Sequence, residues 1–188
     1  MPSAPDICFD LATLAQDRDA LLELNLEYMQ WVLAGMAPVF GTPTDRLQDQ
    51  ALADYVAISL DKVCAAAPPR GVFYLIQADG QLAGMAGLRP LDTGPAAGPA
   101  AEIKRLYIRP AWRGQRLGQH ALARLLADAR AFGYRSVCLD SAPFMAAAHA
   151  LYLAQGFLDC APYAGCEVPS EFHARWRFMR LDLLAAPA

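Results

Sequence analysis

The chain has 188 residues, of which 55% are hydrophobic and 19% charged, and its formal net charge at pH 7 is −3. This length suffices for one domain with its own core, and the high apolar content excludes an intrinsically disordered chain. Proteins that bind nucleic acids usually carry a basic surface, so the acidic balance argues against that class. No long linker divides the chain, and we expect a single domain over residues 1–188.

Cysteine usage and hydropathy restrict the compartment in which the protein is expected. The five cysteines are odd in number and show no CxxC spacing, which indicates neither a disulfide framework nor a zinc site, and we expect no bound metal. The N-terminus has no basic start and no long apolar run, so no signal peptide is predicted. Charge, Pro or Gly interrupts each apolar run before it reaches the length of a membrane span. These features favour a soluble, cytoplasmic protein that does not bind membranes.

In chain order, residues 6–11 are predicted to form a short edge strand. Leucines and aromatic residues at helical spacing predict a helix over 15–37, which Gly35 and Pro38 are expected to end. A second helix follows, with apolar residues at spacings of three and four. Its expected cap and apolar stripe are Thr44 or Asp45, Leu52, Val56, Leu60 and Val63.

The hydrophobic period then changes to that of β-strands. Residues 71–77 and 82–88 flank the turn 78–81, whose Asp-Gly pair predicts a hairpin. The later elements are expected to be a small-residue loop (93–100), a strand (101–109), a helix (115–132), a strand (134–140), a short helix (145–155) and a final strand (175–183). This order predicts a mixed α/β fold with one antiparallel part and one parallel crossing.

The segment RGQRLG at 113–118 connects a predicted strand to a predicted helix. A helix N-terminus presents free N–H groups and a partial positive charge that suit a phosphate, and Gly114 and Gly118 allow close backbone approach. Arg113 and Arg116 are able to neutralise a diphosphate. The segment is neither a Walker A loop nor a dinucleotide-binding GxGxxG motif. Taken alone, it is equally compatible with an exposed turn that carries two solvated arginines.

The sequence on both sides of the segment 113–118 makes its interpretation more specific. AEIKRLYIRPAWRGQRLGQHALARLL closely resembles the acyl-CoA-binding core of the GNAT superfamily of N-acetyltransferases, in which a P-x-x-R-G-x-G-[IL]-G loop joins a strand to a helix. AAAHALYLAQGF at 146–157 resembles the A-x-x-L-Y-x-x-x-G-F segment of that family, and the resemblance covers most of the chain. Arg116 stands where the family most often has glycine, and Met145 where many members have asparagine. The resemblance implies a mixed, mostly antiparallel sheet of six to seven strands with helices on both faces.

The resemblance also implies acetyl-CoA as cosubstrate, and it places the cofactor along the predicted strand 101–109 and the loop that follows. Backbone groups of Leu106, Tyr107 and Ile108 would pair with the pantetheine arm as with an added strand. The N–H of Ile108 or its neighbour would polarise the thioester carbonyl. The pyrophosphate would lie in a cradle formed by Arg113, Gly114, Gln115, Arg116, Leu117 and Gly118. A bulge in this strand would separate it from the next one and open the slot for the cofactor.

Two residues are candidates for proton transfer. Glu102 occupies the position of the glutamate base that some family members use, and it would act directly or through a water. The alternative is an edge-strand carboxylate that pairs with Lys104 or Arg105. Tyr152 corresponds to the tyrosine that reaches the CoA sulfur, and a phenol is protonated at neutral pH and able to donate to a thiolate. Its alternative role is a core tyrosine that packs against Phe157.

The acceptor is expected to be a primary amine of a small molecule, an amino acid or a peptide, in a site built by the first two helices, the hairpin and the loop 159–174. Glu27, Glu167 and Glu171 are candidates for binding a cationic amine, and His149 is interpreted as a solvated helix residue. A non-catalytic acyl-CoA sensor on the same fold is the competing hypothesis. Such a sensor would keep the loop but would need neither proton-transfer residue. Dimers are frequent among similar proteins, so a homodimer is one expected state.

Overall fold

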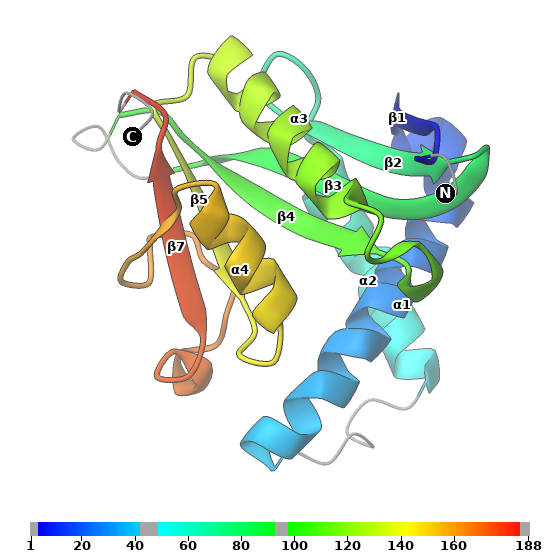
Figure 1. The fold of residues 1–188 in the computed structure, drawn as a ribbon. Coiled ribbons are helices and arrows are strands. Elements are labelled where there is room, and N and C mark those ends of the chain that lie inside the picture. Colours follow the sequence, from blue (N-terminus) through cyan, green and yellow to red (C-terminus); the bar gives the residue numbers. More distant parts are fainter. Residues whose placement is uncertain (1–3, 42–48, 93–97, 185–188) are drawn as a thin grey trace.

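Figure 1 shows the fold of the protein in a computed structural model that describes residues 4–41, 49–92 and 98–184. The elements are β1 (Ile7–Leu11), α1 (Leu14–Phe40), α2 (Asp49–Cys64), β2 (Val72–Ala78), β3 (Gln81–Leu91), β4 (Ala100–Ile108), α3 (Leu117–Ala131), β5 (Ser136–Ser141), α4 (Ala146–Ala154), β6 (Leu158–Asp159) and β7 (Arg177–Asp182), with 3-10 turns at Pro110–Trp112 and Ser170–Phe172. Within these ranges, no helix combines the length and the apolar character that a membrane span requires.

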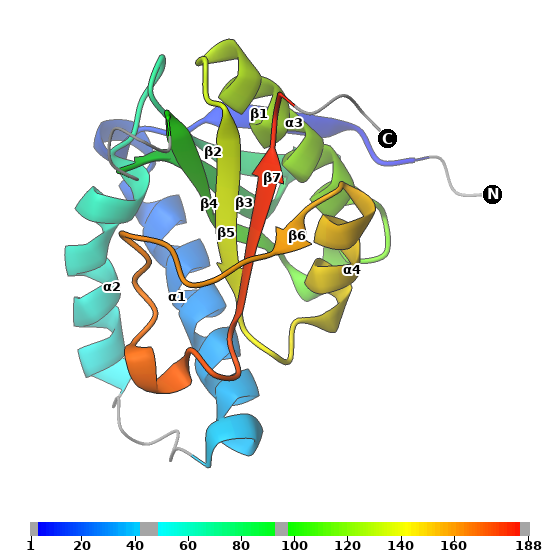
Figure 2. The ribbon, with the colours of Figure 1, turned by 90° about the vertical axis from the view of Figure 1, so that its left-hand side faces the viewer.

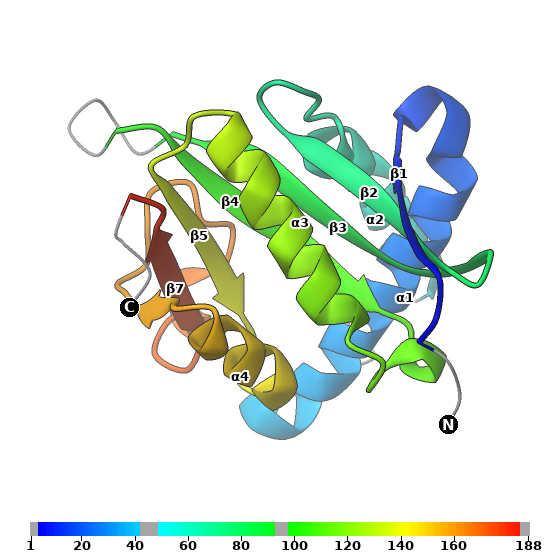
Figure 3. The same ribbon diagram turned by 45° about the horizontal axis from the view of Figure 1, so that its top comes forward.

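The seven strands form one sheet in the order β1-β2-β3-β4-β5-β7-β6. Neighbouring strands are antiparallel except β4 and β5, which are parallel and are connected by α3. Helices α3 and α4 cover one face of the sheet, and α1 and α2 cover the other (Figures 2 and 3). The predicted fold class is therefore confirmed, and the very short strand β6 is an element that the sequence did not indicate.

Two apolar cores lie on opposite faces of the sheet, and β4 contributes to both. Ala101 and Ile103 pack in the core beneath α3, whereas Tyr107 packs in the core beneath α1 and α2. Because successive side chains of a strand point to opposite faces, Glu102 and Lys104 face the side of α1 and α2. Burial of each large apolar side chain in these cores stabilises the fold by about 1.5–3 kcal/mol. Strand β4 is thus held between two well-packed cores, and its charged side chains lie on the side of α1 and α2.

Helix α1 continues beyond its predicted end. It ends at Phe40, with Gly41 in the left-handed conformation (φ 64°), and Pro38 lies inside its last turn. There the proline removes only one hydrogen-bond donor near the end of the ladder, which the helix tolerates. Gly35 does not end the helix either; it serves packing, because a Cβ built on it would lie 2.4 Å from the ring of Phe144. This glycine admits an aromatic ring that also contacts Trp31.

The second helix agrees with the prediction where the structure describes it. The proposed caps Thr44 and Asp45 lie outside the described residues. The stripe of apolar positions is buried against the sheet, as expected, and consists of Leu52, Val56, Leu60 and Val63. The predicted hairpin is also confirmed, with Asp79 and Gly80 at positive φ (49° and 73°) between β2 and β3.

Strand β4 carries a bulge at the position where it separates from β5. Met85 of β3 pairs with Tyr107, but Gly87, two residues on, pairs with Lys104, so β4 contains one extra residue. Arg105 adopts a left-handed conformation there (φ 57°). On its other edge, β4 pairs with β5 only through residues 100–102 and 136–138. Beyond Glu102 the two strands part, which is the opening that the resemblance implied.

The close contact between β3 and β4 at this bulge depends on Gly84. A Cβ built on Gly84 would lie 2.2 Å from the carbonyl oxygen of Tyr107, a backbone atom that cannot move aside alone. We expect Gly84→Ala to lower the free energy of unfolding by about 2 kcal/mol, as overpacking does. The matched control is Gly118→Ala, because its nearest contact, Leu151 Cδ2, is at 3.5 Å. Thermal unfolding of both variants checks this, and equal melting temperatures would contradict it.

Candidate active site

The loop between β4 and α3 presents a row of free backbone N–H groups. The amides of residues 114–118 make no hydrogen bond to any residue in the described part of the chain, whereas those of Gln119 and His120 both donate to the carbonyl of Arg116. Gly114 and Arg116 have positive φ (80° and 64°), which turns the chain into the first turn of α3. Five free amides at the N-terminus of a 15-residue helix form a cradle suited to an anion.

The two arginines of the loop differ in their surroundings. Arg113 Nε donates to the carbonyl of Ile108 at 2.9 Å, and its guanidinium lies 4.9 Å from the ring centre of Trp31 and 5.7 Å from that of Tyr107. Arg116 is exposed, and its side chain has no partner within the described ranges. Both side chains are exposed, so that Arg116 is a free cation and Arg113 is anchored to the end of β4 through Nε alone.

The edge of β4 that faces β5 is unpaired after Glu102 within the part of the chain that the structure describes. The three residues expected to contact pantetheine lie on this stretch, at the C-terminal side of the bulge. Tyr107 and Ile108 are buried on opposite faces, and Leu106 is half-buried. Their side chains thus anchor the strand while its backbone edge stays available, which is the arrangement that strand addition requires.

Tyr152 packs in the core and also keeps its hydroxyl accessible. Its ring lies 5.9 Å from that of Phe157, so the packing role considered above is present. The residue is 6% exposed. Its hydroxyl has no hydrogen-bond partner in the described part of the chain, but the oxygen is not completely buried. Burial, followed by the neighbouring Tyr28 and Asp140, raises the pKa of Tyr152, which keeps the phenol protonated at neutral pH.

Glu102 is completely buried and fully paired. Its Oε2 accepts a hydrogen bond from Arg89 Nε and forms an ion pair with Arg89 Nη2, both at 2.7 Å, and its Oε1 accepts a hydrogen bond from Tyr163 Oη at 2.8 Å. Lys104 Nζ lies 3.4 Å from Oε1. Pairing with Lys104 is thus present, as the alternative reading foresaw, whereas Arg105 does not contact this carboxylate. A proton can reach Glu102 only along one of these hydrogen bonds or after one of them breaks.

Two further carboxylates meet Lys104. Its Nζ lies 3.5 Å from Oδ2 of Asp140 on β5 and 3.3 Å from Oε2 of Glu167, in the segment that precedes β7. Asp140 Oδ1 also accepts a hydrogen bond from Trp176 Nε1 at 2.9 Å. The sequence contained one signal for Asp140, since it is an acidic residue that ends an otherwise apolar central strand. Sequence reasoning assigned it no role.

Glu167 ties the segment before β7 to the rest of the site. It pairs with Lys62 of α2 at 2.7 Å, with Arg89 at 3.2 Å and with Lys104. Burial opposes ionisation, but the hydrogen bond from Lys62 and the charges of Lys104 and Arg89 outweigh it and lower the pKa of Glu167 to about 2. Glu167 was expected to bind a cationic amine, and the structure instead commits it to three cations of the protein itself.

The other two candidates for binding a cationic amine are placed differently. Glu27 accepts hydrogen bonds from Arg109 at 2.7 Å and 3.0 Å, and Glu23 contacts the same guanidinium. Glu171 lies exposed in the 3-10 turn at Ser170–Phe172. Glu27 and Glu167 are thus paired with cations of the protein itself, and Glu171 lies at the exposed surface.

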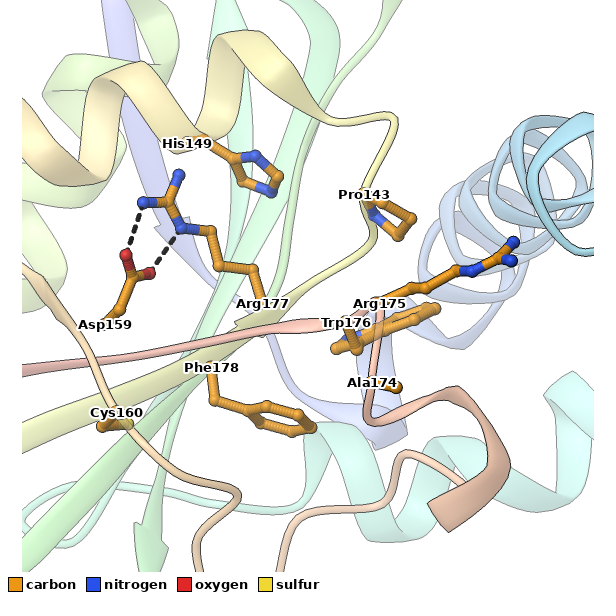
Figure 4. A pocket seen from close by; sticks show the side chains of 9 residues that line it. All are labelled: Pro143, His149, Asp159, Cys160, Ala174, Arg175, Trp176, Arg177 and Phe178. Carbon is orange, nitrogen blue, oxygen red and sulfur yellow. Dashed lines mark hydrogen bonds and ion pairs between the residues drawn. The ribbon is translucent and has the colours of Figure 1, made fainter.

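A separate hollow of about 420 Å³ lies beside β7, between α4 and the segment that precedes that strand (Figure 4). It is lined by Pro143, His149, Asp159, Cys160, Ala174, Arg175, Trp176, Arg177 and Phe178. His149 is half-buried and lies 3.1 Å from Ser141 Oγ through Nε2, which corrects the expectation of a solvated residue. Neither Glu102 nor Tyr152 borders this hollow. In the described ranges, no group of three or more His, Cys, Asp or Glu residues is arranged to hold a metal ion.

Comparison with known proteins agrees with this geometry. Residues 26–157 match the model of the acetyltransferase (GNAT) family. The chain is 28% identical, over 93% of its length and 97% of the relative's, to an uncharacterized N-acetyltransferase of Schizosaccharomyces pombe. It is 36% identical over 35% of its length to the IAA acetyltransferase of Azospirillum brasilense, of which this stretch spans 43%.

A solved structure supports the same assignment at the level of the fold. The putative acetyltransferase of Salmonella typhimurium with its cofactor acetyl-CoA superposes with a TM-score of 0.57, at 19% identity and 97% coverage of both chains. The family match includes β4, the loop, α3, β5 and α4, which together carry the free amides and Tyr152. This chain belongs to the GNAT family of acetyltransferases and is an acyltransferase.

Proposed function

We propose that this protein transfers the acetyl group of acetyl-CoA to a primary amine of a small molecule, an amino acid or a peptide, as a single cytoplasmic domain. One observation carries the proposal. Strands β4 and β5 part after Glu102, which leaves a strand edge unpaired, the loop that follows β4 carries free amides, and Tyr152 lies on α4, the helix that follows β5. A thioester, a diphosphate and a leaving thiolate require such groups.

The cofactor is assigned to the opening by the chemistry of its parts. The pantetheine arm contains amide groups, which pair with the free edge of β4 at residues 106–108. The pyrophosphate is assigned to the amides of residues 114–118 and to the side chain of Arg116. The Salmonella protein with the same fold binds acetyl-CoA, which supports this assignment. Arg113 contributes by holding the end of β4 through Ile108.

The reaction that we propose is direct attack by the amine. The nitrogen forms a bond to the thioester carbonyl carbon, and the C–S bond breaks when the tetrahedral intermediate collapses. The backbone N–H of Ile108 or its neighbour stabilises the oxyanion. Tyr152 donates its proton to the departing thiolate, and the nitrogen loses one proton. The raised pKa of Tyr152 keeps that proton available at neutral pH.

Glu102 is the proposed acceptor of the proton from the nitrogen. Its carboxylate has no exposed surface, so the proton must travel through a hydroxyl or a water. Tyr163 is the neighbour that is able to pass it on, because its hydroxyl already donates to Oε1 at 2.8 Å. In this relay the hydroxyl oxygen of Tyr163 accepts the proton from the nitrogen and passes its own proton to Oε1 of Glu102, so the phenol is unchanged.

Two substitutions of Arg116 distinguish the contribution of its side chain to binding from the strain of its backbone. We expect Arg116→Ala and Arg116→Gly both to weaken acetyl-CoA binding by about tenfold, since each loses a charge-assisted contact to phosphate. Only Arg116→Gly is expected to gain stability, by about 1 kcal/mol, because Arg116 holds a left-handed conformation (φ 64°). Calorimetric titration and thermal unfolding measure the two effects.

The control for this pair is Arg124→Ala, which removes an exposed arginine of α3 that pairs with Asp128 at 3.2 Å, outside the loop. It should bind acetyl-CoA as the wild type does. Unchanged affinity in both Arg116 variants would remove this side chain from the site. A wild-type protein that does not bind acetyl-CoA would overturn the proposed function.

The acid role of Tyr152 is tested by Tyr152→Phe. The change keeps the ring that packs against Phe157 and removes only the hydroxyl, so acetyl-CoA affinity should remain the same. We expect kcat to fall by about ten- to a thousandfold, the usual range for loss of a general acid. Steady-state rates of CoA thiol release give kcat, and calorimetric titration gives the affinity for acetyl-CoA. Turnover equal to that of the wild type would exclude Tyr152 from proton transfer.

The proton relay is tested by Glu102→Gln. An amide cannot accept the proton, so kcat/KM should fall, and its rise with pH should move to higher pH, where more of the amine arrives already deprotonated. Thermal unfolding must accompany the kinetics, because the substitution also leaves Arg89 and Lys104 less well neutralised. A stable variant whose pH profile matches that of the wild type would show that the proton leaves by another route.

A further inference from the structure

The charges around the opening on the side of α1 and α2 do not balance. The cations there are Lys62, Arg89, Lys104 and Arg105, and the carboxylates are Glu102, Asp140 and Glu167. The first three cations share all three carboxylates. Arg105 forms no ion pair with any carboxylate in the part of the chain that the structure describes. One positive charge is therefore left without a counter-charge at this site.

The contacts that Arg105 does make are weak ones. Its Nη1 donates to the sulfur of Met29 at 2.8 Å, and its guanidinium lies 4.9 Å from the ring centre of Tyr28. Its Nε is buried and has no hydrogen-bond partner. A thioether is a poor acceptor, and a buried donor without a partner costs about 1–3 kcal/mol. The protein keeps an arginine at this position at a cost in stability that these contacts do not recover.

The backbone at Arg105 adds to this cost. The residue occupies the bulge of β4 in a left-handed conformation (φ 57°), which L-residues with long side chains rarely adopt. Bulges re-aim side chains, and this one turns Arg105 toward α1 instead of continuing the alternation of the strand. An ordinary structural role would be served as well by glycine or asparagine. A side chain that is strained, charged and unpaired is typical of a binding group.

Arg105 also lies next to the reacting groups. Its charge and a hydrogen bond from it act on the hydroxyl of Tyr28, whose pKa is raised by burial in spite of them. The charge of Asp140 reaches the same hydroxyl, and Tyr28 in turn acts on Tyr152. The guanidinium meets Met29 and the hydroxyl of Tyr28 but no carboxylate in the described part of the chain, so a negative group of a ligand can still pair with it.

We propose that Arg105 binds an anionic group of the acceptor, and that the acceptor is an amine that also carries a carboxylate. This inference rests on the proposed function and narrows it from primary amines in general to anionic ones. A carboxylate at Arg105 would satisfy the free donors and restore the charge balance of the site. The amine of the same molecule would then face the thioester beside Tyr152. Amines without a negative group would leave Arg105 unpaired in the complex.

The experiment compares acceptors that share a side chain and differ in whether the α-carboxyl group carries a negative charge. Each of the twenty common amino acids is assayed beside its carboxamide, with acetyl-CoA, by release of CoA thiol. We expect the best amino acid to exceed its carboxamide in kcat/KM by at least about tenfold. In Arg105→Met, KM for that amino acid should rise by about ten- to a hundredfold while KM for the carboxamide stays the same, which abolishes the preference.

Two controls keep the result interpretable. Arg105→Lys keeps the positive charge but lacks the planar guanidinium that binds a carboxylate through two hydrogen bonds, and it should retain part of the preference. Arg18→Met removes an exposed arginine whose partner Asp61 lies at 3.7 Å, and it should leave both acceptors unaffected. Acetyl-CoA affinity, measured on every variant, should not change. A wild-type enzyme that treats acid and amide alike, or an Arg105→Met enzyme that still prefers the acid, would overturn the inference and leave the transferase proposal intact.

A binding measurement covers the case in which no amino acid is acetylated. The wild type and Arg105→Met are heated with CoA and each acid or amide, and the melting temperatures are compared. A rise with an acid, absent with its amide and lost in Arg105→Met, supports the inference without turnover. No such rise, together with no turnover, overturns it. Absence of acetyl-CoA binding would instead overturn the proposed function, so the two failures are distinguishable.

Discussion

The single extra residue in β4 is the constraint on which the rest of the site depends. It bends the strand after Glu102, so that β4 and β5 pair over three residues and then part. Three consequences follow from one irregularity. An unpaired strand edge becomes available, the chain leaves that edge through the loop with the free amides, and Arg105 is turned toward α1. On the other edge the contact with β3 survives only because Gly84 lets the carbonyl of Tyr107 approach.

The opening separates two environments of different physical character. On the side of α3 the core is mainly apolar, and the hydroxyls of Tyr74 and Tyr152 are among its few polar groups. On the side of α1 and α2, Glu102, Lys104 and Asp140 are taken out of water and are held by mutual pairing. Desolvation of these charges is costly, and the pairing offsets it only where every group has a partner. Arg105 is the exception, which is why a missing counter-charge is informative at this position.

Local patterns in the sequence predicted most of the fold but only part of the site. The hairpin at Asp79 and Gly80, the loop at 113–118 and the order of strands and helices depend on neighbours in the sequence, and the structure confirms them. The predicted end of α1 was wrong. Gly35 lies inside the helix and makes room for Phe144, a residue more than a hundred positions away that the local pattern does not reveal. The pairing of Glu102 with Arg89 and Tyr163 is of the same kind, since it joins three distant segments.

This division has a consequence for how the enzyme can change. The half of the site assigned to the cofactor lies within residues 106–118 and uses mainly backbone groups, which substitutions leave in place. The acceptor half that we propose would instead be built from side chains of α1, α2, β3, β4 and the segment before β7. On this proposal, a substitution at Arg105 is expected to alter recognition of the acceptor without touching the cradle for the pyrophosphate. A fold of this construction can keep one cosubstrate while its second substrate varies, and the acceptor must be inferred from charge and not from the family.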